Sequence, residues 1–233
     1  MKQFFNNITR LTAYNVKIIF GNKFIYFMLS ALALYVVTVL VNLFGDEEFL
    51  ESTAYEILLV PSILVIFYPL CFGIQNDQDA KIIEIIFGIP NYRYKVWLFR
   101  LLIAYVICFV STLLLAILTN WLLVEVPVFY LSIEVMAPAL LIGTLSFMFS
   151  TIIKNGSGTA VLVIIFGLIF FINSSNLGTS KWNLFLNPFS VPVSTNPIIY
   201  AEILFSNRLI LLIASVVFLL TGLYKTQGRE GFM

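Results

Sequence analysis

Long apolar runs, separated by short polar segments, recur along the whole chain. A helix that crosses a hydrocarbon core of about 30 Å needs about 20 predominantly apolar residues. Such a helix pairs its own backbone groups, as a segment in lipid must. The pattern therefore predicts an all-α polytopic membrane protein, a single transmembrane domain over residues 1–233, whose six transmembrane helices lie at about 24–44, 56–75, 97–122, 134–153, 158–173 and 208–224.

The fifth predicted span, 158–173, is short, because its length at 1.5 Å per residue is only about 24 Å. It either continues into the next loop or lies where the bilayer is thinned. The outer loop that follows, about residues 174–207, contains two apolar stretches, 182–186 and 198–205, that are too short to span. These stretches predict short interfacial or re-entrant helices between spans five and six, with an extended loop as the alternative.

Residues 1–20 are too polar to span, but their apolar side chains follow a three-to-four spacing, as at Phe4 and Ile8. Arg10 and Lys17 lie off that apolar stripe. This pattern predicts an N-terminal interfacial helix in the plane of the membrane surface, with its basic side towards anionic headgroups. A cytoplasmic lead-in helix is the alternative.

Lysine and arginine are distributed unevenly about the predicted spans. Eleven of the thirteen lie on the side of the two termini, whereas the opposite side has only Lys181 and Arg208. Because cytoplasmic loops are enriched in these residues, both termini are expected in the cytoplasm.

Composition excludes several classes of function. The chain is 61% hydrophobic and 11% charged, with a mean hydropathy of +1.00. It has no histidine, which is the commonest general base and metal ligand, and its two cysteines, Cys71 and Cys108, lie in different apolar segments. We therefore expect no catalytic constellation, no metal site and no cofactor in this chain. A net charge of +1 without a basic run gives no indication of nucleic-acid binding.

The segment 77-DQDAKIIEIIFGIPNYRYK-95 lies between the second and third predicted spans. Asp77, Lys81, Glu84 and Gly88 recur at intervals of four, three and four and form one polar stripe, and Asp77 and Lys81 suit an i,i+4 ion pair. The apolar residues between them are Ile82, Ile83, Ile85, Ile86, Phe87 and Ile89. The pattern predicts a cytoplasmic helix that begins with acidic residues and ends before Pro90. Its broad apolar face needs a partner, which is the membrane surface, other cytoplasmic helices or a groove in another protein.

The arrangement resembles the membrane subunits of ABC transporters of the ABC-2, or type V exporter, family. Those subunits have an N-terminal interfacial helix, six spans with both termini inside, a coupling helix after span two and short helices in the loop between spans five and six. Their loop after span two often reads acid-x-acid, then Gly-Thr-Leu-Glu, then a proline six residues after that glutamate. Here Asp77, Asp79, Glu84 and Pro90 match, whereas Lys81-Ile82 stands where Gly-Thr is frequent.

The resemblance implies an exporter of the bacterial inner membrane that is driven by a separate pair of ABC ATPase subunits. This chain has no Gly-rich phosphate-binding loop ending in Lys-Ser/Thr, so ATP and Mg²⁺ are expected on that pair. A second permease chain, either a copy or a sister chain, would complete the pathway. The resemblance implies ATPase coupling by Asp77, Asp79, Lys81, Ile82, Glu84, Ile85, Pro90 and Arg93, and contacts of Arg10 and Lys17 with the partner or with lipid headgroups.

A pathway through this chain would be lined by neutral groups, which favours an amphipathic or lipid-like substrate. The candidate lining residues are Ser62, Tyr68, Ser111 and Thr144. Polar side chains of this kind also commonly bond to their own helix or to a neighbouring helix, which is the alternative.

Two rival functions stay open. A self-contained secondary transporter or channel usually has ionisable residues inside its spans. The candidates in this sequence, Glu56, Arg100, Glu134 and Arg208, are instead predicted at span ends. The other rival is a non-transporting membrane partner in an ATPase-driven assembly.

Overall fold

The structure, a computed structural model, describes residues 20–21, 23–44, 49–82, 88, 93–193 and 195–226, with residues 93–95 described by their backbone alone. The predicted interfacial helix with Arg10 and Lys17 lies outside the described residues. So do Glu84, Ile85 and Pro90 of the predicted coupling helix, and the side chain of Arg93.

All regular structure in the described ranges is helical. Five helices are long and apolar enough to cross a membrane, which confirms the prediction of an all-helical, multi-pass membrane protein. The apolar helix that corresponds to the fifth predicted span has only 17 residues. In chain order the elements are α2 (Phe24–Leu43), α3 (Glu51–Asp79), the π-helix η1 (Arg93–Leu98), α5 (Phe99–Leu122), α6 (Val128–Ile153), α7 (Gly156–Ile172), α8 (Ser174–Leu177) and α9 (Pro197–Lys225).

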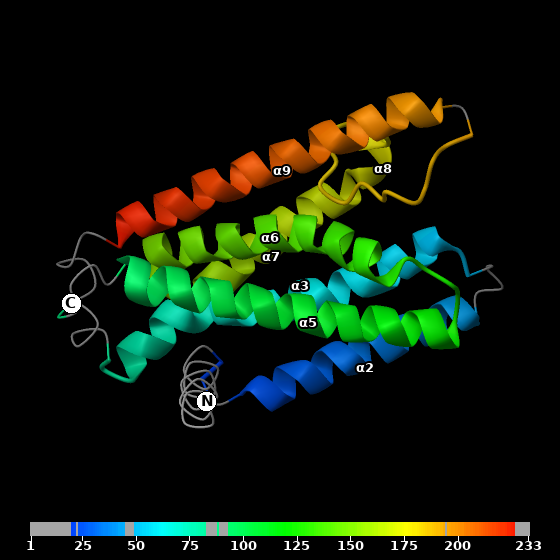
Figure 1. The fold of residues 1–233 in the computed structure, drawn as a ribbon. Helices are drawn as coiled ribbons and strands as arrows, with labels where there is room; N and C mark the ends of the chain where they lie inside the picture. The colour runs from blue at the N-terminus through cyan, green and yellow to red at the C-terminus, as the bar shows by residue number, and fades with distance from the viewer. Residues whose placement is uncertain are drawn as a thin grey trace, which may run out of the picture.

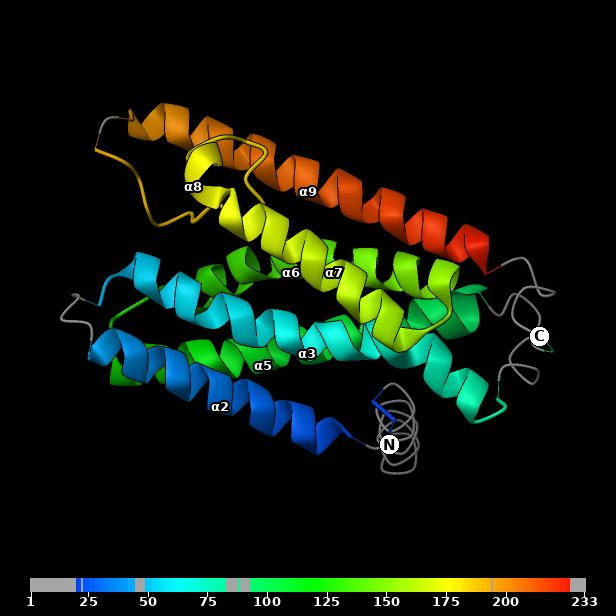
Figure 2. The same cartoon turned by 180° about the vertical axis from the view of Figure 1, so that it is seen from behind.

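The helices run antiparallel to their neighbours in the chain, so that α2 begins and α9 ends at the same end of the bundle (Figure 1). We call this the terminal end, and we call the opposite end, where α3, α6 and α9 begin, the loop end. Helix α6 is central and packs against α3, α5, α7 and α9. Helices α6 and α9 lie close together at the terminal end and separate at the loop end, where α8 and the chain after it lie beside α9 (Figures 1 and 2).

The start of α9 corrects the sequence analysis. Residues 198–205, predicted as a separate short helix, form the first two turns of a continuous 29-residue helix. The Asn196 side chain caps this helix by accepting from the Ile198 N–H at 2.9 Å, and Pro197 occupies its first turn, where no N–H is needed. The hydropathy pattern placed the start of the span too late, at 208 and not at 197, because Glu202, Asn207 and Arg208 interrupt it.

The loop before α9 also differs from the prediction. Residues 182–186, predicted as a short helix, form turns, and α8 has only four residues. Asn183 holds these turns together, because its amide donates to the carbonyl oxygens of Gly178 at 2.9 Å and Ser174 at 3.3 Å. Asn187 joins the loop to α3 by donating to the Ser52 carbonyl at 2.9 Å.

Small and polar residues set the packing of α3, α5 and α6. A methyl group at Gly143 of α6 would lie 2.4 Å from the Tyr105 hydroxyl oxygen of α5, so only glycine permits this approach. The hydroxyls of Ser62 and Thr112 join α3 to α5 at 2.7 Å. Prolines interrupt the two most buried helices internally, at Pro61 and Pro69 in α3 and at Pro138 in α6.

Candidate functional site

The predicted coupling segment begins differently in the structure. Helix α3 continues through Asp77 to Asp79, and Lys81 follows with a left-handed φ of 54°. The Ile82 N–H donates to the Asp77 carbonyl at 3.0 Å, and the Lys81 N–H donates to the Gln78 carbonyl at 2.9 Å. This pattern is the Schellman motif, which ends a helix.

Two predictions about this segment are therefore wrong. Asp77 and Asp79 lie in the last turn of α3 and not at the start of a new helix. Lys81 is exposed and lies outside the helix, so the predicted i,i+4 ion pair of Asp77 with Lys81 is replaced by a different pair. The physical reason is the left-handed conformation of Lys81, which turns the chain away from the axis of α3 directly after the C-cap residue Ala80.

Asp77 pairs instead with Arg100, in the first turn of α5. The carboxylate Oδ2 accepts from the guanidinium Nη1, and the Asp77 side chain is only 2% exposed. The pair joins the end of α3 to the start of α5, that is, the two helices on either side of residues 80–92. Arg100 also lies over the ring of Trp97, 5.4 Å from its centroid.

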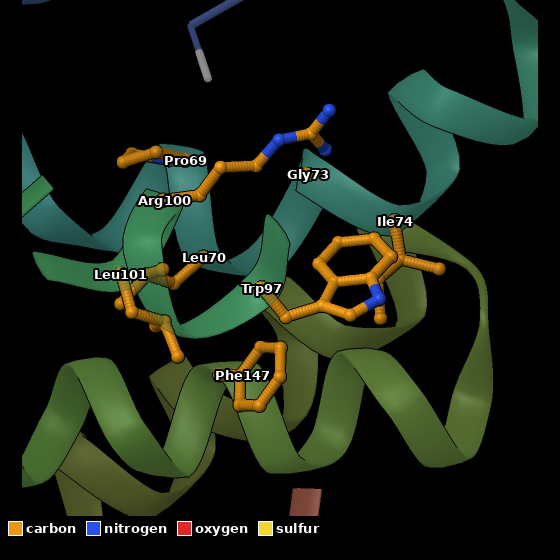
Figure 3. Close-up of a pocket in the computed structure, with 8 residues that line it drawn as sticks. All are labelled: Pro69, Leu70, Gly73, Ile74, Trp97, Arg100, Leu101 and Phe147. Carbon is orange, nitrogen blue, oxygen red and sulfur yellow. The ribbon is translucent and has the colours of Figure 1, made fainter. Parts of the chain in front are cut away.

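A small cavity of about 30 Å³ adjoins this ion pair at the terminal end (Figure 3). Its walls come from α3, from the η1–α5 junction and from α6, through Pro69, Leu70, Gly73, Ile74, Trp97, Arg100, Leu101 and Phe147. Trp97 is buried in the bundle, with only 4% of its surface exposed. Its ring centroid lies 6.3 Å from that of Phe147, and its Nε1–H donor has no acceptor among the described residues.

Phe147 extends this contact towards α9. A methyl group at Gly222 of α9 would lie 2.7 Å from the Phe147 ring, so the two helices touch there. The chain before α2 reaches the same region, because Phe20 is fully buried and a methyl group at Gly21 would lie 3.2 Å from Asn76 Nδ2 of α3. The terminal end of α3 is thus a junction of elements from most of the chain.

A second ion pair lies towards the loop end, between α6 and α9. Arg208 Nε donates to Glu134 Oε2 at 2.7 Å. The same guanidinium donates through Nη1 to Asn207 Oδ1 at 2.8 Å and through Nη2 to the Leu186 carbonyl at 3.1 Å. Asn207 is fully buried and donates to the carbonyl oxygens of the loop at Lys181 and Asn183. The pair therefore fastens α6, α9 and the loop before α9 to one another.

Glu134 and Arg208, predicted at span ends, lie inside helices that begin well before them. Helix α6 begins six residues before Glu134 and helix α9 begins eleven residues before Arg208. Sequence reasoning missed the pair because each charge, taken alone, marks the end of an apolar run. Only their proximity in the fold makes both tolerable inside helices.

Two larger cavities flank this ion pair. The α6–α9 groove, of about 520 Å³, is lined by apolar residues of both helices together with Glu134 and Arg208. The loop-end cavity, of about 590 Å³, lies between α3, α7, the loop and the start of α9, and includes Tyr55, Glu56 and Tyr200. Asn187 borders this second cavity and donates to Glu56 Oε1 at 3.2 Å.

The residues predicted to line a substrate pathway serve in helix packing. Ser62 is buried and bonds to the Leu58 carbonyl and to Thr112. Tyr68 stacks between Phe27 and Phe72, with centroid distances of 3.9 and 5.0 Å. Ser111 and Thr144 each donate to a carbonyl of their own helix. None of the four borders the three cavities described above.

Within the described ranges, no group of three or more Asp, Glu or Cys side chains could hold a metal ion. No protein-family model, no curated protein and no solved structure matches this chain.

Proposed function

We propose that this chain is the membrane subunit of an ATP-driven exporter of the ABC-2 family. In this proposal six helices span the membrane, both termini are cytoplasmic, and the terminal end faces the cytoplasm. A separate pair of ATPase subunits binds residues 77–93, and a second permease chain completes the pathway. The substrate is amphipathic or lipid-like.

The observation that carries the proposal is the conformation of Lys81. In the family motif a glycine often occupies this position, between the acid-x-acid pair and the glutamate. Lys81 has a φ of 54°, a conformation that glycine adopts without steric cost and other residues rarely adopt. The backbone thus has the geometry that the family's glycine favours, although this sequence has lysine there.

The Asp77–Arg100 pair supports a mechanical role for the same region. Helix α3 has 29 residues and measures about 43 Å, which exceeds a hydrocarbon core by about 13 Å. A displacement of residues 80–92 would move α3 and, through the ion pair, α5. The contact of Trp97 in η1 with Phe147 extends this movement to α6, and the contact of Phe147 with Gly222 extends it to α9. Closure of the ATPase pair could therefore rock several helices together.

The first test is purification of the tagged chain in mild detergent, with mass spectrometry of the proteins that co-purify. We expect a stoichiometric cytoplasmic protein with a phosphate-binding loop and an ABC signature. The second test replaces Glu84 with lysine or Ile85 with glutamine, and we expect loss of ATP-driven activity at normal protein level. Lys81→Gly is the matched control in the same segment and keeps that activity. Normal activity in both Glu84→Lys and Ile85→Gln would remove the coupling assignment.

The Glu134–Arg208 pair favours one second candidate, a self-contained secondary transporter. Ionisable residues within spans commonly mark ion or substrate pathways, and these two lie inside α6 and α9. Proteoliposomes that contain this chain alone distinguish the candidates. Gradient-driven uptake without ATP and without an ATPase subunit would favour the secondary transporter.

A further inference from the structure

We propose that the α6–α9 groove binds one zwitterionic phospholipid of the surrounding bilayer, with its phosphate on Arg208, its ammonium group on Glu134 and an acyl chain along the apolar walls. This proposal concerns a resident lipid and does not depend on the exporter assignment. It rests on the shape of the groove, on its depth in the membrane and on its paired charges.

The size and lining of the groove suit an acyl chain. Its volume of about 520 Å³ lies within the range of small-molecule sites. Apart from the ion pair it is lined mainly by alanine, leucine, isoleucine and aromatic side chains. Ile133, Phe205 and Leu212 on its walls are 46%, 72% and 56% exposed, so the groove opens on the outer surface of the bundle, where lipid chains lie.

The depth of the ion pair suits a lipid headgroup. Helix α6 has 26 residues and measures about 39 Å, so a core of about 30 Å centred on it leaves about 4–5 Å beyond each boundary. Glu134 lies six residues, or about 9 Å, from the loop-end start of α6. The backbone of Glu134 is therefore about 4–5 Å inside the hydrocarbon boundary, so its side chain lies near the level at which phospholipid headgroups meet their chains.

The charges at the groove select the kind of headgroup. Glu134 and Arg208 both line the groove, and their side chains are 10% and 17% exposed. A purely anionic headgroup would be attracted by Arg208 but repelled by Glu134. A purely cationic headgroup would be attracted by Glu134 but repelled by Arg208. A zwitterionic headgroup presents an opposite charge to each partner and adds no net charge to a desolvated site. Three of the five N–H donors of Arg208 bond to Glu134, Asn207 and Leu186, which leaves donor capacity for a phosphate oxygen.

The test is native mass spectrometry of the chain purified from the membrane with any subunits that accompany it, after equilibration with equimolar phosphatidylethanolamine and phosphatidylglycerol of identical acyl chains. We expect one retained lipid per chain, with phosphatidylethanolamine favoured by about tenfold, as for a charge-assisted hydrogen bond. The double variant Glu134→Gln/Arg208→Gln removes both charges without leaving one unpaired, and we expect it to retain the two lipids equally.

A second pair of variants keeps the test independent of the ion pair. Ala201 lines the groove and is exposed, so Ala201→Trp fills the groove without disturbing the core. We expect this variant to retain about tenfold less phosphatidylethanolamine. Val217→Trp is the matched control, because Val217 is 52% exposed on the same helix but lies outside the groove. Equal retention of the two lipids by the natural chain, a preference that survives the double variant, or equal lipid retention by the two tryptophan variants would each overturn the proposal.

Discussion

Replacing Asp77 with asparagine preserves the shape of the side chain but removes the charge that compensates Arg100. The Asp77 side chain is 2% exposed and the Arg100 side chain is 13% exposed, so the cation stays largely out of water after the substitution. Removing one partner of a buried ion pair destabilises proteins by about 3–5 kcal/mol. Because Arg100 lies in the first turn of α5 and keeps some exposure, we expect the lower end of that range, about 3 kcal/mol.

The assay is thermal unfolding of the purified protein in one detergent. For a chain of this length, about 1 kcal/mol corresponds to about 2–4 °C in melting temperature, so we expect Asp77→Asn to melt about 6–12 °C lower. Glu51→Gln is the matched control, because it neutralises an exposed acid on the same helix and is expected to change the melting temperature little. Asp77→Leu/Arg100→Met removes both charges and is expected to recover most of the loss.

The double variant also separates stability from transmission. If the pair connects α3 to α5 as we propose, Asp77→Leu/Arg100→Met melts near the natural temperature but couples ATP hydrolysis to transport less well. An unchanged melting temperature in Asp77→Asn would refute the assignment of a buried, compensated pair. Full coupling in the stable double variant would refute its role in transmission.

Two further predictions concern glycine. Lys81→Gly removes the steric cost of a side chain at the left-handed φ of 54° and is expected to stabilise the protein by about 0.5–1 kcal/mol, measured as a higher melting temperature. Ala80→Gly is the control, because φ is an ordinary −79° there and we expect this variant to lower the melting temperature. Gly143→Ala is expected to cost about 1–3 kcal/mol because its methyl group would lie 2.4 Å from the Tyr105 hydroxyl oxygen, and adding Tyr105→Phe should recover part of this loss. Gly73→Ala, with no other atom within 4 Å of the new methyl group, is the control, and an equal loss in both alanine variants would contradict the packing argument.

The apolar pattern predicted the existence of the long helices better than their ends. Hydropathy identifies a span because lipid requires apolar side chains, but it ends a span wherever charges begin. That rule failed at Arg208, because a partner on another helix compensates its charge within α9. It worked at the start of α2, where Lys23 directly precedes the first apolar turn.

The candidate site was less predictable because its contacts are tertiary. Asp77 was assigned to Lys81, four residues away, whereas its partner Arg100 is 23 residues away on the next long helix. The end of α3 was missed because Lys81 occupies a position where glycine would have signalled a helix terminus. The burial of Trp97 was not predictable either, because it depends on the cavity walls that α3 and α6 provide.

The internal prolines of α3 and α6 are the points at which these two central helices bend most easily. A proline has no N–H for the carbonyl four residues earlier, and its ring also displaces that carbonyl. One hydrogen bond of the helix is therefore already missing at that point, so bending there costs less than elsewhere in the helix. Pro138 releases the carbonyl of Glu134 in this way, at the residue whose side chain holds Arg208. Pro69 borders the cavity beside Trp97. The bend that Pro138 permits in α6 therefore lies at the Glu134–Arg208 pair, and the bend that Pro69 permits in α3 lies at the cavity that Arg100 lines. Each ion pair thus joins two helices near a point at which one of them can bend.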